Sequence, residues 1–183
     1  MTAAIEQHSL HSVLRERIVE HLLTGELLRR LWSFGITSVE ILRSEFDRGG
    51  YDLVADKGPV VRHVQLKCSV LGGSASHQKI SRNLALKPSG CVIWVVVDHD
   101  LNFDHFLWFG AGPGEKLPSV DDLKVARHAK GNSLGVKGLR QNLREVKKSK
   151  FQRVEDFDSL LTLLFGADWQ ISHATESVSD AAR

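Results

Sequence analysis

Three polar side chains on two neighbouring predicted strands have the types and spacing for hydrolytic chemistry. Asp52 begins one strand, and Gln65 and Lys67 lie two residues apart on the next. Because side chains alternate across a strand, Gln65 and Lys67 point to the same face, and a short hairpin places Asp52 close to Gln65. A carboxylate, an amide carbonyl and an ammonium group on one patch can hold a hard cation and offset phosphodiester charge. The spacing therefore predicts a metal-assisted hydrolytic site.

The first half of the chain contains the elements that must position these residues. Residues 10–34 carry apolar side chains at helical spacing and precede Gly35, which predicts one long helix. Glycine-containing loops separate three strand-like segments, which predicts an antiparallel meander. A loop is expected next, with a short helix before Pro88, and Gln78 and Lys79 are expected to be solvated at the start of that helix. The three strand-like segments are residues 38–42, 51–55 and 60–68.

The second half adds two strands and a helix. Residues 91–97 form a continuous apolar run typical of a strand buried on both faces, and residues 105–109 form a further strand. Residues 154–165 have the spacing of an amphipathic helix. The order of elements predicts an α/β fold, in which a mixed sheet is flanked by helices. Trp94, Trp108 and Phe109 are expected in the core.

Asp52 together with Gln65-Leu66-Lys67, set in this order of elements, resembles the PD-(D/E)XK nuclease superfamily, which includes many restriction endonucleases. The similarity covers about residues 10–110. Two positions depart from the family pattern: Tyr51 stands where proline is usual, and Gln65 stands for glutamate and removes one negative charge. The resemblance implies a restriction-endonuclease-like α/β fold and a Mg²⁺-dependent nuclease, with Mn²⁺ able to substitute and DNA favoured over RNA. Asp52 and Gln65 would bind the metal, and Lys67 would position the attacking water.

The family also has an acidic residue on the first helix, which leaves Glu20 and Glu26 as candidates. Glu26 has arginines at the third and fourth following positions, so it is expected on a solvated, ion-paired side. Glu20 lies on the apolar stripe that faces the sheet, where a carboxylate needs a partner such as a metal or Lys67. Glu20 is therefore the favoured catalytic and metal-binding acid. The loop acids Glu45 and Asp47 are further candidates to complete the site.

The segment between residues 119 and 153 is strongly basic. From Lys124 to Arg153 it holds ten lysines and arginines against one acid, Glu145. An excess of this size favours a surface that meets a polyanion, although a solvated face is the alternative. The segment is predicted to be mostly loop with short helices, including a helix from Leu139 that would align several basic residues. The predicted nucleic-acid contacts are Lys130, Arg140, Arg144, Lys147 and Lys148.

Length and composition define the class of protein. The 183 residues are 42% hydrophobic with a net charge of +2, which is ordinary globular composition. We expect one domain over residues 1–168 and a disordered tail over 169–183. The two cysteines are expected to be reduced and in the core, and the sequence shows no signal peptide or membrane-spanning segment. These features predict a cytoplasmic protein. A role in restriction, repair or defence, acting as a homodimer, is the main hypothesis; a weakly active or inactive nucleic-acid-binding module is the alternative.

Overall fold

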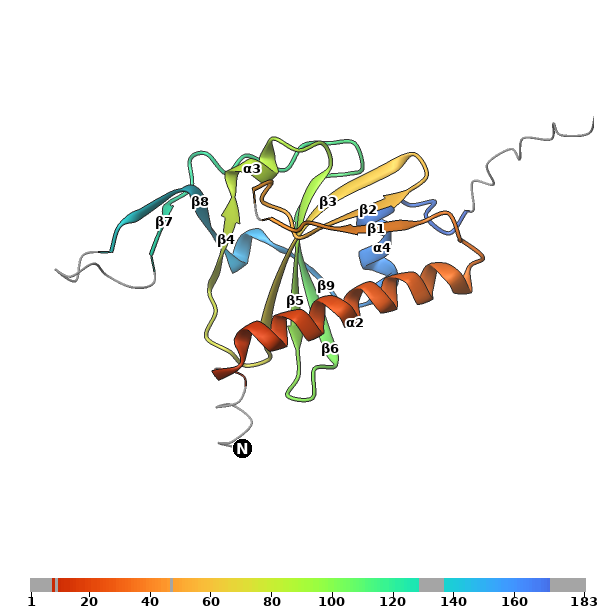
Figure 1. Ribbon diagram of the computed structural model, residues 1–183, viewed down its shortest axis with the longest axis horizontal. Coiled ribbons are helices and arrows are strands. Elements are labelled where there is room, and N and C mark those ends of the chain that lie inside the picture. Colours follow the sequence, from red (N-terminus) through yellow and green to blue (C-terminus); the bar gives the residue numbers. More distant parts are fainter. Residues whose placement is uncertain (1–7, 9, 47, 129–136, 172–183) are drawn as a thin grey trace, which may run out of the picture.

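The computed structural model describes residues 8, 10–46, 48–128 and 137–171. It is a mixed α/β fold with two sheets, a six-stranded sheet in the order β1-β2-β3-β5-β6-β9 and a three-stranded sheet in the order β4-β8-β7 (Figure 1). The predicted fold class is confirmed. The elements are α2 (Ser12–Ser33), β1 (Glu40–Arg43), β2 (Leu53–Lys57), β3 (Val60–Val70), β4 (His77–Ser81), α3 (Arg82–Ala85), β5 (Gly90–Val97), β6 (Phe103–Gly110), β7 (Val125–Arg127), β8 (Leu139–Lys147), the 3₁₀ helix η1 (Lys148–Lys150), β9 (Gln152–Val154) and α4 (Phe157–Phe165).

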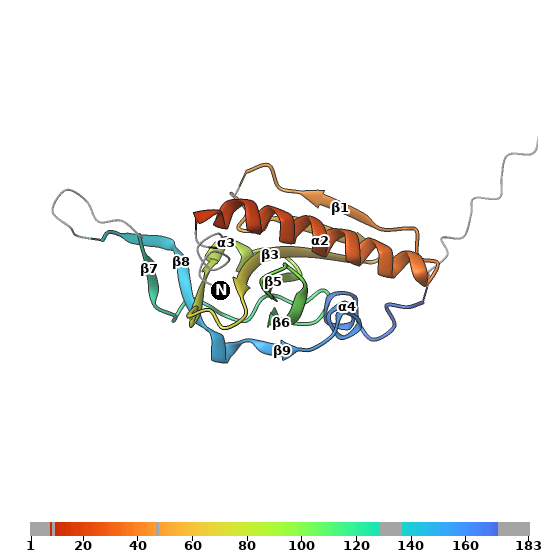
Figure 2. The same ribbon diagram turned by 90° about the horizontal axis from the view of Figure 1, so that it is seen from below.

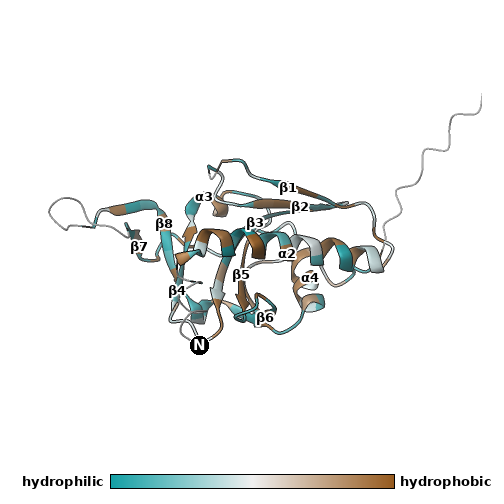
Figure 3. Cartoon of the chain, turned by 60° about the horizontal axis from the view of Figure 1, so that its bottom comes forward, coloured by the Kyte–Doolittle hydropathy of each residue, from teal (hydrophilic) through white to brown (hydrophobic). Residues whose placement is uncertain are grey.

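The six-stranded sheet is mostly antiparallel. β1, β2 and β3 form the predicted meander, which is thereby confirmed, although its first strand begins at Glu40 rather than Ser38. β3 and β5 are parallel, because the chain leaves the sheet through β4 and α3 before it returns as β5. β5 is buried along its whole length, as its apolar sequence predicts. Figure 3 colours the chain by hydropathy, and brown segments lie beneath α2 where β5 runs.

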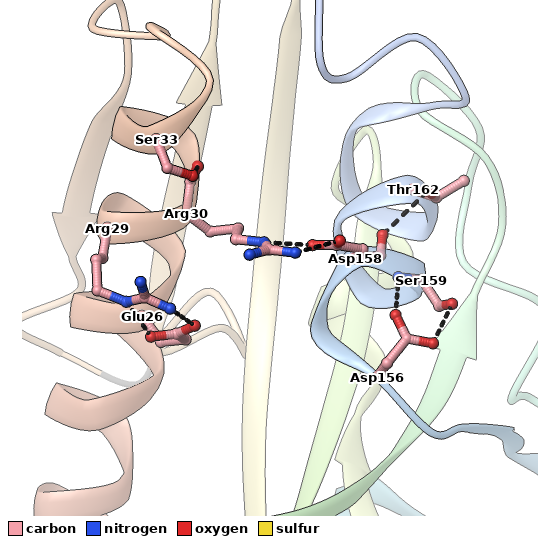
Figure 4. Close-up of polar contacts among 8 residues, drawn as sticks. All are labelled: Glu26, Arg29, Arg30, Ser33, Asp156, Asp158, Ser159 and Thr162. Carbon is pink, nitrogen blue, oxygen red and sulfur yellow. Dashed lines mark hydrogen bonds and ion pairs between the residues drawn. The ribbon is translucent and has the colours of Figure 1, made fainter.

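Two hydrophobic cores cover the two faces of this sheet. α2 and α4 pack on one face together with Trp108, and Figure 2 shows α2 running along that side. The other core holds Trp94 and Phe109 and receives Ile80 of β4 and Val146 of β8. The three aromatic residues expected in the core are therefore buried. α2 and α4 are also joined by an ion pair between Arg30 and Asp158 (Figure 4).

Three strands, β4, β7 and β8, lie where the sequence predicts other structure. β4 replaces part of the loop predicted after residues 60–68, β7 lies in the segment predicted to be mostly loop, and β8 replaces the helix predicted from Leu139. β4 and β8 pair with each other, and Ile80 and Val146 become core residues through that pairing. This tertiary pairing determines the backbone here, because neither segment has a long apolar period of its own.

The C-terminal region also differs from its prediction. Residues 152–154 form β9, so α4 begins at Phe157 with Asp156 as its N-cap, whose carboxylate accepts from the backbone N–H of Ser159 at 2.8 Å. Trp169 is buried in the core, so the prediction that a disordered tail begins at residue 169 is wrong. Residues 172–183 lie outside the described part of the chain. In the described ranges no helix is both long and apolar enough to cross a membrane.

Candidate active site

Asp52 lies at the point where β2 separates from β3. Its backbone N–H donates to the carbonyl of Val64 at 2.9 Å, and its carboxylate accepts the backbone N–H of Leu66 at 2.6 Å. The β2 pairing reaches Val64, whereas β3 continues to Val70. The Asp52 carboxylate therefore accepts a hydrogen bond from β3 just beyond the point where the β2–β3 pairing ends. This contact fixes the position of the carboxylate relative to the backbone of β3.

A cavity of about 300 Å³ opens beside Asp52, between α2, β3 and β4. It brings together Asp52, Lys67 and Glu20, three residues that the sequence predicts to form one site. We call it the Asp52 cavity. Its lining residues are Val13, Glu16, Arg17, Val19, Glu20, Asp52, Leu66, Lys67, Cys68, Gln78 and Val95.

Lys67 and Arg17 are the positively charged residues of the cavity wall, and Arg17 is paired with Glu20. Lys67 lies on β3 in register with Trp94 of β5 and is partly exposed. Within the described residues no ion pair engages its ammonium group, in contrast to several other lysines and arginines of the chain. A lysine in this position can attract the negative charge of a phosphate at the cavity mouth.

The two helix acids have different surroundings. Glu20 is 7% exposed, lines the Asp52 cavity, and forms ion pairs with Arg17 at 2.9 Å and Arg43 at 3.3 Å. Glu26 lines a different cavity and forms hydrogen bonds with Arg29 at 2.7 and 2.6 Å (Figure 4). Hydrogen bonding to Arg29 lowers the pKa of Glu26. The structure therefore brings Glu20, and not Glu26, to Asp52 and Lys67.

Gln65 is placed apart from the other predicted site residues. It is on the same sheet face as Lys67, as alternation predicts, but it is buried and does not line the Asp52 cavity. Its carbonyl oxygen accepts the backbone N–H of Ser81, at 3.4 Å, where β4 leads into α3. Gly50, with φ of +75°, packs against the same serine, so closely that a Cβ would lie 2.4 Å from the Ser81 Cβ. The expected convergence of the Gln65 carbonyl with Asp52 and Lys67 is not what the structure shows.

Gln78 is a cavity residue that sequence reasoning set aside. The sequence predicts a solvated position for Gln78 at the start of a helix, but Gln78 lies on β4 and lines the Asp52 cavity. The available signal was its position after the Lys67 strand, before the chain returns to the sheet. The loop acid Glu45 lines another cavity together with Tyr51, and Asp47 lies outside the described residues.

The donor atoms of the cavity fit a cation that shares its coordination with a substrate. Mg²⁺ is commonly held by one or two carboxylates, with phosphate oxygens and water completing its octahedron. Three carboxylates, those of Asp52, Glu20 and Glu16, border the cavity, and Asp52 and Glu20 are the two that the sequence predicts as metal ligands. The described side chains contain no group of three or more His, Cys, Asp or Glu arranged to hold a metal by themselves. A metal at this position would therefore depend on substrate oxygens for part of its binding.

The basic segment forms part of a sheet and not the predicted helix. β4, β8 and β7 extend from one end of the six-stranded sheet (Figures 1 and 2). Arg140, Lys147 and Lys148 are exposed, but Arg144 is 7% exposed and its guanidinium donates to the carbonyls of Gln141 at 2.7 Å and other residues nearby. Alternation in β8 turns Arg144 inward beside Val146. Its predicted surface role is wrong. Lys130 lies outside the described residues.

The exposed face of this sheet is nevertheless basic. His77 pairs with Lys147 and Lys79 pairs with Glu145 in the β4–β8 register, so these four residues share a face. Glu145 forms an ion pair with Lys124 at 2.7 Å. Hydrogen bonding to Lys124 lowers the pKa of Glu145, and the nearby positive charges act in the same direction. We call the three-stranded sheet with its basic residues His77, Lys79, Lys124, Arg140 and Lys147 the basic ribbon. Alternation along β8 places Arg140 on the side of Arg144 and not on the face of Lys147.

Comparisons with known proteins give a distant structural likeness and no family. No protein-family model matches the sequence, and neither does any curated protein. Among solved structures, the chain is similar to a bacterial homing endonuclease, I-Ssp6803I, with 19% sequence identity over 64% of this chain and 82% of that one. The TM-score is 0.28, which is too low to establish a common fold or activity. Function must therefore be inferred from the residues of the Asp52 cavity and the basic ribbon.

Proposed function

We propose that this chain is a metal-dependent endonuclease that hydrolyses phosphodiester bonds in DNA at the Asp52 cavity. The observation that carries the proposal is the meeting of Asp52, Glu20 and Lys67 in one cavity, from three separate segments of the chain. Two carboxylates and a lysine form the minimum set for a cation-assisted attack of water on a phosphodiester. The class of activity suggests a role in restriction, repair or defence within the cytoplasm.

The residues of the cavity divide the work between them. Asp52 and Glu20 would hold Mg²⁺, or Mn²⁺ in its place, and the bound cation would withdraw charge from the scissile phosphate. Lys67 would orient the attacking water and stabilise the negative charge that develops on the phosphate. Gln78, on the opposite wall, can donate a hydrogen bond to a phosphate oxygen. Gln65, bonded to Ser81, positions β3 relative to β4.

The basic ribbon supports a nucleic-acid substrate. Gln78 lines the cavity on β4, and the adjacent Lys79 belongs to the ribbon, so the two surfaces meet at one strand. Lysines and arginines on a projecting sheet can contact successive phosphates without reading the bases. A duplex bound along the ribbon would therefore be delivered to the cavity. Cutting both strands with one site per chain requires two copies.

A second candidate function is a nucleic-acid-binding module with a weak catalytic site. Two observations favour it: Glu20 is neutralised by Arg17 and Arg43, and the Gln65 carbonyl is engaged by Ser81. The two ion pairs reduce the negative charge that Glu20 can offer to a cation, and the Ser81 hydrogen bond occupies a neutral oxygen that could otherwise be a ligand. A binding module would retain DNA affinity without cleaving DNA at any metal concentration.

Plasmid cleavage distinguishes the two functions. Highly purified protein is incubated with supercoiled plasmid in Mg²⁺, in Mn²⁺ and in EDTA, and nicked and linear products are quantified. We expect cleavage that depends on the metal and is abolished by Lys67→Ala. Lys116→Ala, which changes an exposed lysine that does not line the cavity, is the matched control and should cleave normally. DNA binding with no metal-dependent cleavage would favour the binding module. Full cleavage by Lys67→Ala would show that the Asp52 cavity is not the catalytic site.

A further inference from the structure

α2 carries a second apolar surface on the side opposite to its packed one. The packed side contributes Val19, Leu23, Leu27 and Leu31 to the core. The other side exposes large apolar residues toward both of its ends, including Leu14, 59% exposed, and Trp32, 72% exposed, with His21 and Gly25 between them. Several large apolar side chains exposed on one helix face often mark an interaction surface. The outer face of α2 comprises Leu14, Ile18, His21, Gly25, Leu28 and Trp32, each of which is exposed.

The spacing of these six residues is that of a helix–helix interface. They alternate steps of four and three, which is the heptad spacing of a coiled-coil seam. The pattern is also symmetric about Leu23, so that it reads the same from either end of the helix. A helix with such a pattern can pair with an antiparallel copy of itself about a two-fold axis, as a closed isologous interface requires.

Gly25 lacks an explanation within one copy of the chain. Glycine in a helix interior costs about 1 kcal/mol relative to alanine. A Cβ at Gly25 would meet no atom within 4 Å, so packing inside the chain does not demand a glycine here. Glycine does permit the close approach of a second backbone or of a large side chain. In an antiparallel pairing centred on Leu23, Gly25 would face the partner's His21, a residue whose imidazole contacts Arg43 of its own chain at 2.9 Å.

We propose that the outer face of α2 is the surface on which two copies of this chain form an antiparallel, two-fold dimer. The register sets the indole of Trp32 against the partner's Leu14, Leu28 against the partner's Ile18, and Gly25 against the partner's His21. Large and small side chains then alternate across the seam, whereas a parallel pairing would oppose indole to indole and leave a gap between two glycines. The proposal does not depend on nuclease activity.

The size of the surface agrees with a stable dimer. A helix of 22 residues is about 33 Å long, and two such helices packed along their length bury roughly 1,200 Å², the lower limit for a specific interface. Beside the seam, Leu22 and Gly25 border a cavity of about 570 Å³ that is also lined by Leu101, Phe103 and Phe157. Side chains on the flank of a partner helix would gain additional apolar contact there. Glu20, on the packed side of α2, remains directed to the Asp52 cavity.

Sedimentation analysis of the full chain at micromolar concentrations, without DNA, tests the proposal. We expect a dimer, and we expect Trp32→Glu and Gly25→Leu each to raise the dissociation constant at least tenfold while leaving circular dichroism and thermal unfolding of the monomer intact. Leu86→Glu, which alters an exposed leucine outside α2, is the matched control and should leave the dimer unchanged. A monomer at all concentrations, or a dimer that neither α2 variant weakens, would overturn the proposal.

Disulfide trapping tests the register independently of stability. Protein carrying His21→Cys is mixed with protein carrying Gly25→Cys, both in a Cys68→Ser background, and oxidised. The antiparallel register predicts a mixed disulfide between the two proteins as the main cross-linked product. Preferential cross-linking of each protein to itself would indicate a parallel pairing and contradict the two-fold antiparallel dimer.

Discussion

The Asp52 cavity and the basic ribbon are built in different ways. The cavity depends on single contacts of fixed geometry, such as the Leu66 N–H donated to the Asp52 carboxylate at the end of the β2–β3 pairing. The ribbon is a set of mostly exposed charges on paired strands, in which Lys124 pairs with Glu145 and Lys79 donates to the carbonyl of Arg127 at 3.0 Å. Substitutions in the cavity should therefore abolish chemistry individually, whereas substitutions in the ribbon should reduce binding by degrees.

The largest effect is expected from Asp52→Asn. The amide keeps an oxygen that can accept the Leu66 N–H but loses the charge that would hold a cation, so cleavage should fall about 10³-fold. Asp52→Ala should lose the same activity and, in addition, about 1 to 2 kcal/mol of stability, because the Leu66 N–H loses its acceptor. Plasmid cleavage and urea unfolding measure the two quantities. Equal activity of Asp52→Asn and the unmodified protein would show that the carboxylate has no catalytic role.

The next effect compares two acids on one helix. Glu20→Gln should reduce cleavage by roughly 10-fold to 100-fold, because it removes the charge of one of the two carboxylates proposed to hold the cation. Glu26→Gln should change cleavage less than about twofold, because Glu26 lines a different cavity and is paired with Arg29. Initial rates at saturating Mg²⁺ provide the comparison. If Glu26→Gln proves the more damaging of the two, the assignment of the helix acid is wrong.

A graded effect is expected from the ribbon. Replacing Lys79, Arg140 and Lys147 with alanine should weaken DNA binding for all sequences and flatten the plot of log K against log salt by about 2 to 3 units, since each duplex phosphate contact contributes about 0.9. Arg144→Ala is the internal contrast: its guanidinium is bonded to backbone carbonyls, so it should lower stability and leave the salt slope unchanged. Fluorescence anisotropy over a range of salt concentrations measures the slope. An unchanged slope in the triple variant would leave the ribbon as an ordinary solvated surface.

The smallest effect concerns Gln65. The sequence interpretation, with Gln65 as a metal ligand, predicts that Gln65→Glu tightens Mg²⁺ binding. The contact with Ser81 instead predicts that Mg²⁺ affinity changes less than about twofold, while burial of a carboxylate lowers stability by about 1 to 2 kcal/mol. Calorimetric titration with Mg²⁺ in the presence of an uncleavable duplex decides between them. Tenfold tighter Mg²⁺ binding by Gln65→Glu would indicate that residue 65 is a metal ligand.

The sequence predicts the six-stranded sheet better than it predicts the ribbon, for a physical reason. The meander and β5 carry their own apolar periods, and strand alternation places Gln65 and Lys67 on one face without any tertiary information. Helical spacing along α2 likewise places Glu20 on the packed side of the helix and Glu26 on the solvated side. These inferences succeed because an element that buries one of its faces must carry apolar residues at the spacing of that face.

The failures occur where a long-range contact decides the structure. β8 has charged residues on both faces, and only its pairing with β4 shows that Arg144 is turned inward. The position of Gln78 in the cavity depends on that same pairing. The side chain of Gln65 accepts a hydrogen bond from Ser81, which belongs to a different segment of the chain. No local pattern in the sequence predicts that contact. Trp169 similarly joins the core through packing against Phe34, at a ring separation of 5.0 Å.

A metal-dependent nuclease centre in the Asp52 cavity must bind a cation beside the substrate. Anomalous diffraction at the manganese edge, from crystals grown with Mn²⁺ and a short duplex, detects such a cation. We expect one anomalous peak in the cavity, bordered by carboxylate oxygens of Asp52 and Glu20 and by a phosphate oxygen, and we expect Asp52→Asn to remove it. An ordered duplex bound with the cavity free of manganese, or a peak that persists in Asp52→Asn, would show that Asp52 does not hold a catalytic metal there.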